Sequence, residues 1–135
     1  MTLRNRSSRR LSRDRGAAAV ELALLLPILL IIVFGIIDFG RMFHAQLTLT
    51  EAAREGARAE SLGSDPDARV QEAAGRLGAV GTEVAGACPD SEDAIVYAHH
   101  DFTFVTPLSP ILELYGSGVD GSYSLSGKGV MPCFD

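Results

Sequence analysis

The longest uncharged stretch of the chain is the sixteen-residue run LALLLPILLIIVFGII, from Leu22 to Ile37. When Ala17–Val20 and Glu21 are included, the apolar segment has twenty-one positions, or about 31 Å of helix. This length matches the hydrocarbon core of a bilayer, which is about 30 Å thick. A chain of 135 residues leaves little else to cover a helix that is apolar on all sides. The run therefore predicts a membrane-spanning helix in preference to the core helix of a soluble protein.

A basic leader, residues 1–16, precedes this segment and carries six arginines against one acid, Asp14. Residues 39–135 instead hold six basic and fourteen acidic residues. Because positive charge is retained on the cytoplasmic side, we expect the N-terminus inside and the long C-terminal part exported. The leader alone could suit a nucleic-acid arm. The net charge of −5 and the apolar run favour a membrane partner and no nucleic acid.

A secretory signal peptide is the alternative interpretation of a basic start followed by an apolar run. Its cleavage site would lie near FGRMFHA, residues 39–45. Bulky Phe43 occupies the position, three before the cut, where a small residue is needed, and Asp38 and Arg41 add charge. We therefore expect the segment to stay attached to the exported part.

The helix is expected to continue far beyond the membrane, from about Ala17 to Ser61, and to end at Gly63. Pro27 should kink it, because proline removes one backbone hydrogen bond. Above the membrane, one helical face is polar, and a second is made of small side chains that allow close packing. This packing stripe serves either the chain's own head or another subunit, or both at different heights. It consists of Leu49, Ala52, Ala53 and Gly56.

The remaining residues predict a small α+β head with a short antiparallel sheet. We expect a short helix from Pro66 to Gly78, then a loop over 78–93. Residues 94–99 and 102–106 are rich in β-branched and aromatic residues and predict two strands of a hairpin. A helical turn at 111–115 and a last strand over 123–131 follow. The predicted parts are a leader (1–16), a helix (17–62) and an extracytoplasmic head (63–135).

Two cysteines, Cys88 and Cys133, both lie in the exported part. A disulfide is the simplest use of them in an oxidising compartment. It would stabilise a head that is otherwise marginal in size. Two unpaired buried thiols are the alternative.

The strongest candidate for an enzymatic or metal-binding head is His99-His100-Asp101. On a strand the two histidines point to opposite faces, which does not suit a shared metal. No zinc-protease, dithiol, nucleophile-elbow or phosphate-loop pattern is present in the sequence. We expect no enzymatic activity, no cofactor, no metal and no small-molecule substrate, and we interpret these three residues as the turn of the hairpin.

The order Gly16-Ala17-Ala18-Ala19-Val20-Glu21 stands at the cytoplasmic edge of the apolar run. Glu21 lies about 6 Å inside Ala17, so one interpretation has it reach the headgroups and pair with Arg15. In the other, the chain is cut after Gly16, and Ala17 gains an α-ammonium group. The Glu21 carboxylate of one subunit then meets that ammonium on an axially staggered neighbour. This pairing is favoured because an unpaired charge is costly in a low-dielectric surrounding.

A basic leader, a glycine, four small or apolar residues, a glutamate and an apolar helix resemble the signal of type IV pilins and pseudopilins. More narrowly, RGAAAVELALLLPILLIIVFGIIDFGRMF, QLTLTEAAREGARA, the DFTFVTPLSPIL stretch and the Met131-Pro132-Cys133 end resemble the TadE-like pilus assembly family. The resemblance implies a minor pseudopilin of the tight-adherence (Flp-type) pilus, cut by a prepilin peptidase between Gly16 and Ala17. One position differs, because Leu22 stands where Tad pseudopilin signals place tyrosine.

Two functions remain open at this point. In the first, the chain is a minor pilin or pseudopilin of the bacterial cytoplasmic membrane that assembles with other pilus subunits through its helix. In the second, it is an unprocessed single-pass envelope scaffold of the same machinery. The two differ in the cut at Gly16 and in entry into a filament.

Overall fold

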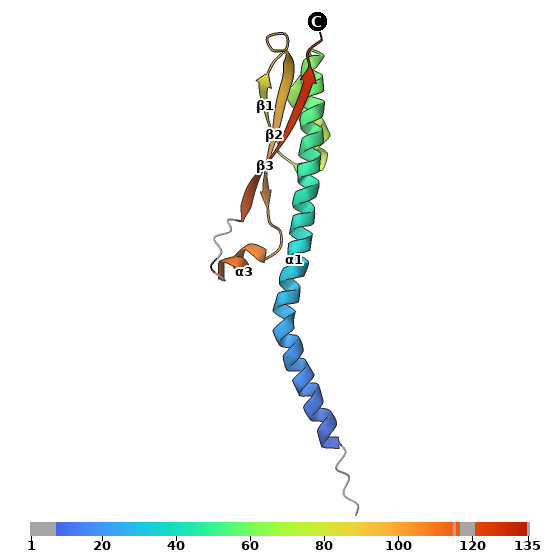
Figure 1. Ribbon diagram of the computed structural model, residues 1–135, viewed down its shortest axis with the longest axis vertical. Helices are drawn as coiled ribbons and strands as arrows, with labels where there is room; N and C mark the ends of the chain where they lie inside the picture. The colour runs from blue at the N-terminus through green and yellow to red at the C-terminus, as the bar shows by residue number, and fades with distance from the viewer. Residues whose placement is uncertain (1–7, 115, 117–120, 135) are drawn as a thin grey trace, which may run out of the picture.

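The computed structural model describes residues 8–114, 116 and 121–134. The first seven residues of the predicted leader, with Arg4 and Arg6, lie outside the described part. A long helix rises through the molecule and carries a small head on its upper half (Figure 1). This arrangement confirms the predicted α+β class. The elements are α1 (Ser8–Ser61), α2 (Pro66–Ala74), the 3-10 turn η1 (Gly75–Leu77), β1 (Gly81–Gly86), β2 (Asp93–Thr103), α3 (Leu108–Leu114) and β3 (Ser122–Pro132).

Helix α1 begins earlier than the sequence led us to expect. It starts at Ser8 instead of Ala17, since residues 8–15 contain no proline or glycine and arginine is a good helix former. Its end at Ser61 was predicted, and Gly63 follows with a φ of 69°. The Ser64 amide donates to the Ala59 carbonyl at 2.8 Å, which closes the helix as glycine-terminated helices commonly end. Figure 1 shows a bend in the N-terminal half, which contains Pro27.

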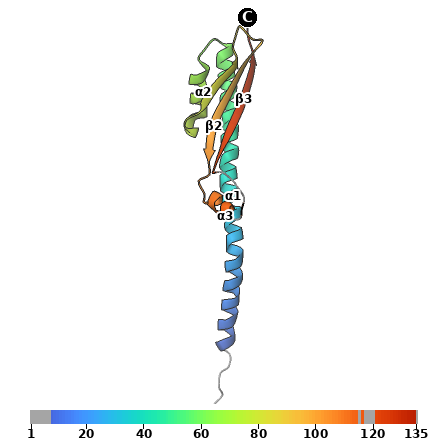
Figure 2. The ribbon, with the colours of Figure 1, turned by 90° about the vertical axis from the view of Figure 1, so that its left-hand side faces the viewer.

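The short helix α2 follows directly and has a well-formed start. The Asp65 side chain accepts hydrogen bonds from the amides of Asp67 and Ala68, and Pro66 occupies the first helical position. Both features stabilise a helix N-terminus. The helix therefore turns back at once and packs beside the upper part of α1 (Figure 2).

The sheet has three antiparallel strands in the order β1-β2-β3. The predicted hairpin of 94–99 and 102–106 was wrong, because β2 runs unbroken through His99-His100-Asp101. Each of these three residues has a partner on β3, from Ser126 to Ser124, so the backbone has no need to turn. The hairpin partner of β2 is instead β1, which lies in the stretch 78–93 that we predicted to be a loop.

The upper half of α1 lies against one face of this sheet, and the core forms between them (Figure 2). Along β2, the buried residues Ala94, Val96 and Ala98 alternate with half-buried ones, because successive side chains of a strand point to opposite faces. Most core side chains are small, so the helix and the sheet approach closely. The buried cluster is Leu49, Ala52, Ala53, Ala57, Val70, Ala74, Val80, Val96 and Ala98.

Glycines make the closest part of this contact. A β-carbon on Gly127 would overlap the backbone of Leu49 and Thr50, and one on Gly129 would overlap the backbone of Ala53. On the helix side, a β-carbon on Gly56 would lie 2.5 Å from Cγ2 of Val70. Backbone therefore packs on backbone where β3 crosses α1.

Candidate functional site

The lower half of α1 extends below the head as an apolar rod, defined here as residues 17–37 (Figure 1). The described residues include one helix that is long and apolar enough to cross a membrane, and its most apolar window is entirely unburied within the chain. Large side chains along the rod, such as Leu24 and Ile36, are 71% and 69% exposed. Contiguous apolar surface of this extent marks contact with lipid or protein.

The predicted processing site lies at the lower end of this rod. Gly16, Ala17 and Glu21 are all exposed on the helical surface, and nothing lies within 4 Å of where a Gly16 β-carbon would stand. Because α1 starts at Ser8, the Gly16–Ala17 bond is part of a continuous helix. The site is therefore sterically open but its backbone is not extended.

The packing stripe has a different location from the rod. Leu49, Ala52 and Ala53 are fully buried under the chain's own sheet, and Gly56 is buried beside Val70. The sequence left open whether this stripe packs against the chain's own head or against another subunit. At this height the structure shows that it packs against the head. The stripe is therefore covered by the chain's own head at this height, whereas the rod is largely uncovered.

The structure adds one residue that sequence reasoning missed. Asp38, the first residue after the rod, is fully buried. Its carboxylate accepts hydrogen bonds from the amides of Val105 at 3.1 Å and Thr106 at 3.3 Å, and from the Thr106 hydroxyl. Nη1 of Arg41 lies 3.5 Å from Oδ1 of Asp38. We call this set the Asp38 clamp. Its signal in the sequence is a lone acid that ends an apolar run.

The ionisation of Asp38 follows from these contacts. Burial raises the pKa of the carboxyl group, but the hydrogen bonds from Thr106 and Val105 and the charge of Arg41 lower it by more. The net result is a pKa below the ordinary value. The carboxylate is therefore charged at neutral pH and holds the loop between β2 and α3 against the upper end of the rod.

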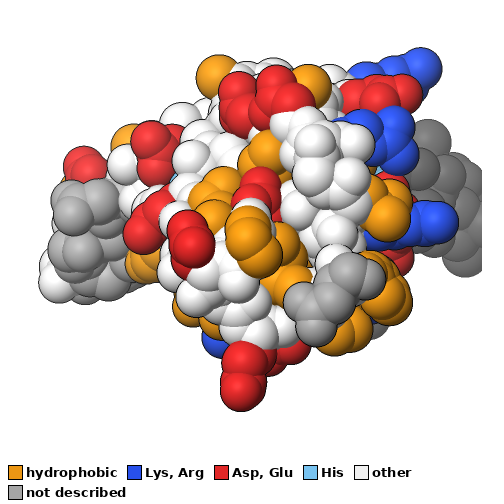
Figure 3. All heavy atoms as spheres, turned by 90° about the horizontal axis from the view of Figure 1, so that it is seen from above, with side chains coloured by type: hydrophobic (Ala, Val, Ile, Leu, Met, Phe, Trp, Pro, Cys, Tyr) orange, Lys and Arg blue, Asp and Glu red, His pale blue; other side chains and the backbone are white. Residues whose placement is uncertain are grey.

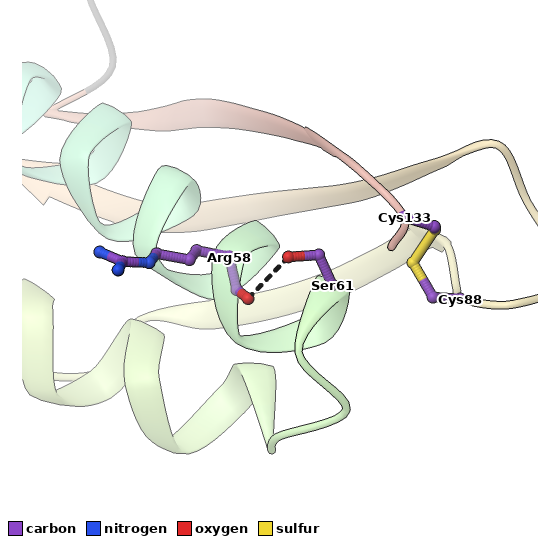
Figure 4. Close-up of a disulfide and its surroundings, with 4 residues drawn as sticks. All are labelled: Arg58, Ser61, Cys88 and Cys133. Atoms are coloured by element: carbon purple, nitrogen blue, oxygen red, sulfur yellow. Dashed lines mark hydrogen bonds between the residues drawn. A yellow bond between two sulfur atoms is a disulfide. The ribbon is translucent and has the colours of Figure 1, made fainter. Parts of the chain in front are cut away.

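The two cysteines meet at the opposite end of the head. Cys88 and Cys133 form a disulfide with Cα atoms 5.7 Å apart, close to the last turn of α1 (Figure 4). In that turn the Ser61 hydroxyl donates to the Arg58 carbonyl at 2.9 Å. The Cys133 amide also donates to the Glu92 carbonyl at 3.0 Å. The C-terminal strand is thus fastened to the head by covalent and hydrogen bonds.

The distal end of the head carries an acidic surface. Viewed along the long axis, acidic side chains spread over this end, and most visible Lys and Arg side chains lie toward one side (Figure 3). This distribution agrees with the acidic balance of residues 39–135.

The two neighbouring histidines are not brought together by the strand. His99 Nε2 lies 3.5 Å from the carboxylate of Glu83 on β1, whereas His100 Nδ1 lies 3.1 Å from the Ala79 carbonyl oxygen. Within the described residues, no group of three or more His, Cys, Asp or Glu side chains is placed to hold a metal. The two rings therefore have separate surroundings.

Comparison with known protein families supports part of the resemblance found in the sequence. The family model described as TadE-like protein matches residues 16–58. No curated protein and no solved structure shows significant similarity to the chain. The match confirms, for residues 16–58, the resemblance found in the sequence. It begins at Gly16, covers the rod and the packing stripe, and ends within α1.

Proposed function

We propose that this chain, with its TadE-like segment at residues 16–58, is a minor pilin or pseudopilin that takes part in assembling a Tad (Flp-type) pilus. The observation that carries the proposal is the division of α1 into two functional halves. The head covers the upper half, from Ala45 to Ser61, on one side. The rod is left uncovered for the membrane and for the helices of other pilus subunits.

The proposed location is the bacterial cytoplasmic membrane, with residues 1–16 inside and the head outside. The six arginines of the leader support this orientation, because basic residues next to a span are retained in the cytoplasm. The disulfide supports an extracytoplasmic head, since such bonds persist in oxidising compartments. The head then stands on the outer face with its acidic end farthest from the membrane.

The proposed processing step is a cut between Gly16 and Ala17 by a prepilin peptidase. The peptide bond must leave the helix to be hydrolysed, and Gly16 helps, because glycine in a helix is about 1 kcal/mol less favourable than alanine. The open space around Gly16 also leaves room for an enzyme. The cut removes the charges that hold the helix to the cytoplasmic leaflet.

The proposed assembly step pairs Glu21 of one subunit with the new α-ammonium of Ala17 on its neighbour. Both positions are exposed on the rod, about 6 Å apart along one helix. When parallel helices are staggered by that distance, opposite charges meet in a low-dielectric surrounding, where an unpaired charge costs several kcal/mol. The pairing therefore selects one axial offset between subunits.

The experiment is to recover the full-length gene product from envelopes and from sheared surface filaments, and to sequence its N-terminus. We expect the chain to begin at Ala17 in both fractions. A chain that begins at Met1 or Thr2 would contradict the processing step. A chain absent from filaments that contain other pilins would favour the second function, an unprocessed single-pass scaffold.

A further inference from the structure

The Asp38 clamp fixes one segment of the head at the height where the rod ends. The two backbone amides that Asp38 binds belong to Val105 and Thr106, which connect β2 to α3. Asp38 immediately follows the apolar run. The segment from Val105 to Leu114 is therefore held near the level where the rod leaves the bilayer, and not at the top of the head (Figure 1).

The last turns of the rod are partly covered by other parts of the chain. Within the run from Leu22 to Ile37, only Ile31, Phe34 and Gly35 are partly covered. Together with Asp38 they have the spacing of one helical face. Helix α3 contacts α1 and overlaps the middle of α1 in the side view (Figure 2). Helix α3 therefore stands at about the height where the rod ends (Figures 1 and 2).

The segment is apolar on its exposed side. Val105 is 69% exposed and Leu114 is 84% exposed, and Pro107 and Pro110 are exposed as well. Glu113 is the one charged residue in the sequence from Phe102 to Leu114. Nearby on α1, Phe39 and Phe43 are 55% and 65% exposed. Such side chains at this height are typical of an interfacial membrane contact.

We propose that the segment Val105–Leu114 inserts shallowly into the outer leaflet and forms a second membrane contact of the head. The distance from Ile31 to Asp38 is about 10 Å along the helix, and interfacial helices bury their apolar face by about 5–10 Å. The occupant is lipid, because the bilayer that surrounds the rod is continuous with this height. The inference depends on the rod being the membrane anchor.

The clamp makes this insertion compatible with a charged residue. Asp38 stands at the edge of the bilayer, where a bare carboxylate would be unfavourable beside lipid, but three hydrogen bonds and Arg41 satisfy it. The Arg41 side chain is 47% exposed and lies where lipid phosphates do, so it contacts them on its outer side. Two contacts, rod and segment, then set the height and tilt of the head above the membrane.

The test uses the absence of tryptophan from the sequence. Single variants Leu114→Trp, Leu29→Trp in the rod and Val130→Trp on distal β3 each replace an exposed side chain, so the fold is retained. The full chain is placed in nanodiscs of phosphatidylcholine and phosphatidylglycerol. The acyl chains are brominated either near the headgroup or near the terminal methyl, and bromine quenches tryptophan emission on contact.

We expect L114W to lose emission with the shallow bromines more than with the deep ones, L29W to lose it most with the deep ones, and V130W to be unchanged. Quenching of L29W without quenching of L114W would overturn the membrane contact while leaving the anchor intact. No quenching of L29W would overturn the anchor and the contact together. An L114W emission shielded from aqueous acrylamide but insensitive to bromine would indicate a protein occupant, such as a second copy, and would also overturn the inference.

Discussion

Gly129 of β3 lies directly on the backbone of Ala53 in α1, with no room for a methyl group between them. Gly127 has the same relation to Leu49 and Thr50 two residues earlier. Because strand residues two apart share a face, the two glycines form a flat track on β3. The packing stripe of α1 rests on this track, so the long helix and the sheet of the head meet backbone to backbone.

The first prediction concerns this track. Gly129→Ala should lower the free energy of unfolding of the head by about 1–3 kcal/mol, because overpacking forces backbone shifts. Gly81→Ala on β1 is the matched control, since its β-carbon would meet His99 at an ordinary 3.8 Å and should change stability by less than about 0.5 kcal/mol. Denaturation in detergent, followed by tyrosine fluorescence, measures both. Equal stability of the two variants would show that β3 does not bear on α1 as described.

The second prediction concerns the disulfide. Cys88 and Cys133 are 45 positions apart, so the bond restricts the unfolded chain by about 4 kcal/mol in the entropy model. Reduction should therefore lower the denaturation midpoint of the wild-type chain strongly. A double Cys88→Ser, Cys133→Ser variant should start at the reduced midpoint and show no response to reductant. A wild-type midpoint that is indifferent to reductant would contradict the stabilising role.

The sequence predicted best what depends on local pattern. The apolar run identified the rod, and Gly63 and Pro66 marked the end of one helix and the start of the next. Sequence reasoning failed where the pairing of strands decides the secondary structure. The segment GTEVAG has two glycines and little apolar content, yet it forms β1 because β2 offers it a free edge. The same completed pairing keeps the backbone straight through His99-His100-Asp101.

The candidate site shows the same division. The roles of Gly16 and Glu21 stay predictions, which come from their spacing behind a basic leader and from the family resemblance; both residues are exposed on one helix. The Asp38 clamp joins Asp38 to Val105 and Thr106, which are 67 and 68 positions away from it in the sequence. No spacing rule relates an acid at a helix surface to two amides of a distant loop. The glycine track was missed for the same reason, because its meaning lies in what α1 places opposite it.

The third prediction concerns the Asp38 clamp. Asp38→Asn retains the shape but presents an amide to two N–H donors, so the loop should be released. Amide hydrogen exchange of Val105 and Thr106 should accelerate by about tenfold or more, the counterpart of roughly 1.5–3 kcal/mol for hydrogen bonds to a charged group. Asp101→Asn, an exposed acid on β2, is the control and should leave both rates unchanged. Slow exchange in both variants would show that the carboxylate does not hold the loop.

The fourth prediction concerns pH. The pKa of Asp38 is lowered in the folded chain, so the folded form binds fewer protons than the unfolded form near the ordinary value of about 3.9. The stability that Asp38 supplies is complete above that value and is lost as pH falls through the lower folded pKa. Protection of the Val105 and Thr106 amides should be constant from neutral pH to about pH 4 and should decline below it. In the D38N variant the protection of these two amides should not decline below pH 4. A decline of equal size in D38N would show that another group causes the pH dependence.

The fifth prediction separates anchoring from assembly. Glu21→Gln removes the charge at the lower end of the rod but keeps the size of the side chain and makes the helix easier to insert. The variant should therefore reach the membrane and be processed normally. It should enter filaments about tenfold less, because the Ala17 ammonium of the neighbouring subunit loses its partner in low dielectric.

Glu51→Gln is the control for E21Q, since Glu51 is exposed on the part of α1 that stands beside the head and takes no part in the proposed pairing. The measurement is the ratio of the chain in sheared filaments to the chain in membranes, with the N-terminus sequenced in both. A normal ratio for E21Q would remove Glu21 from the assembly step. A low ratio with an uncut N-terminus would instead place Glu21 in recognition by the peptidase, because processing must precede pairing in this mechanism.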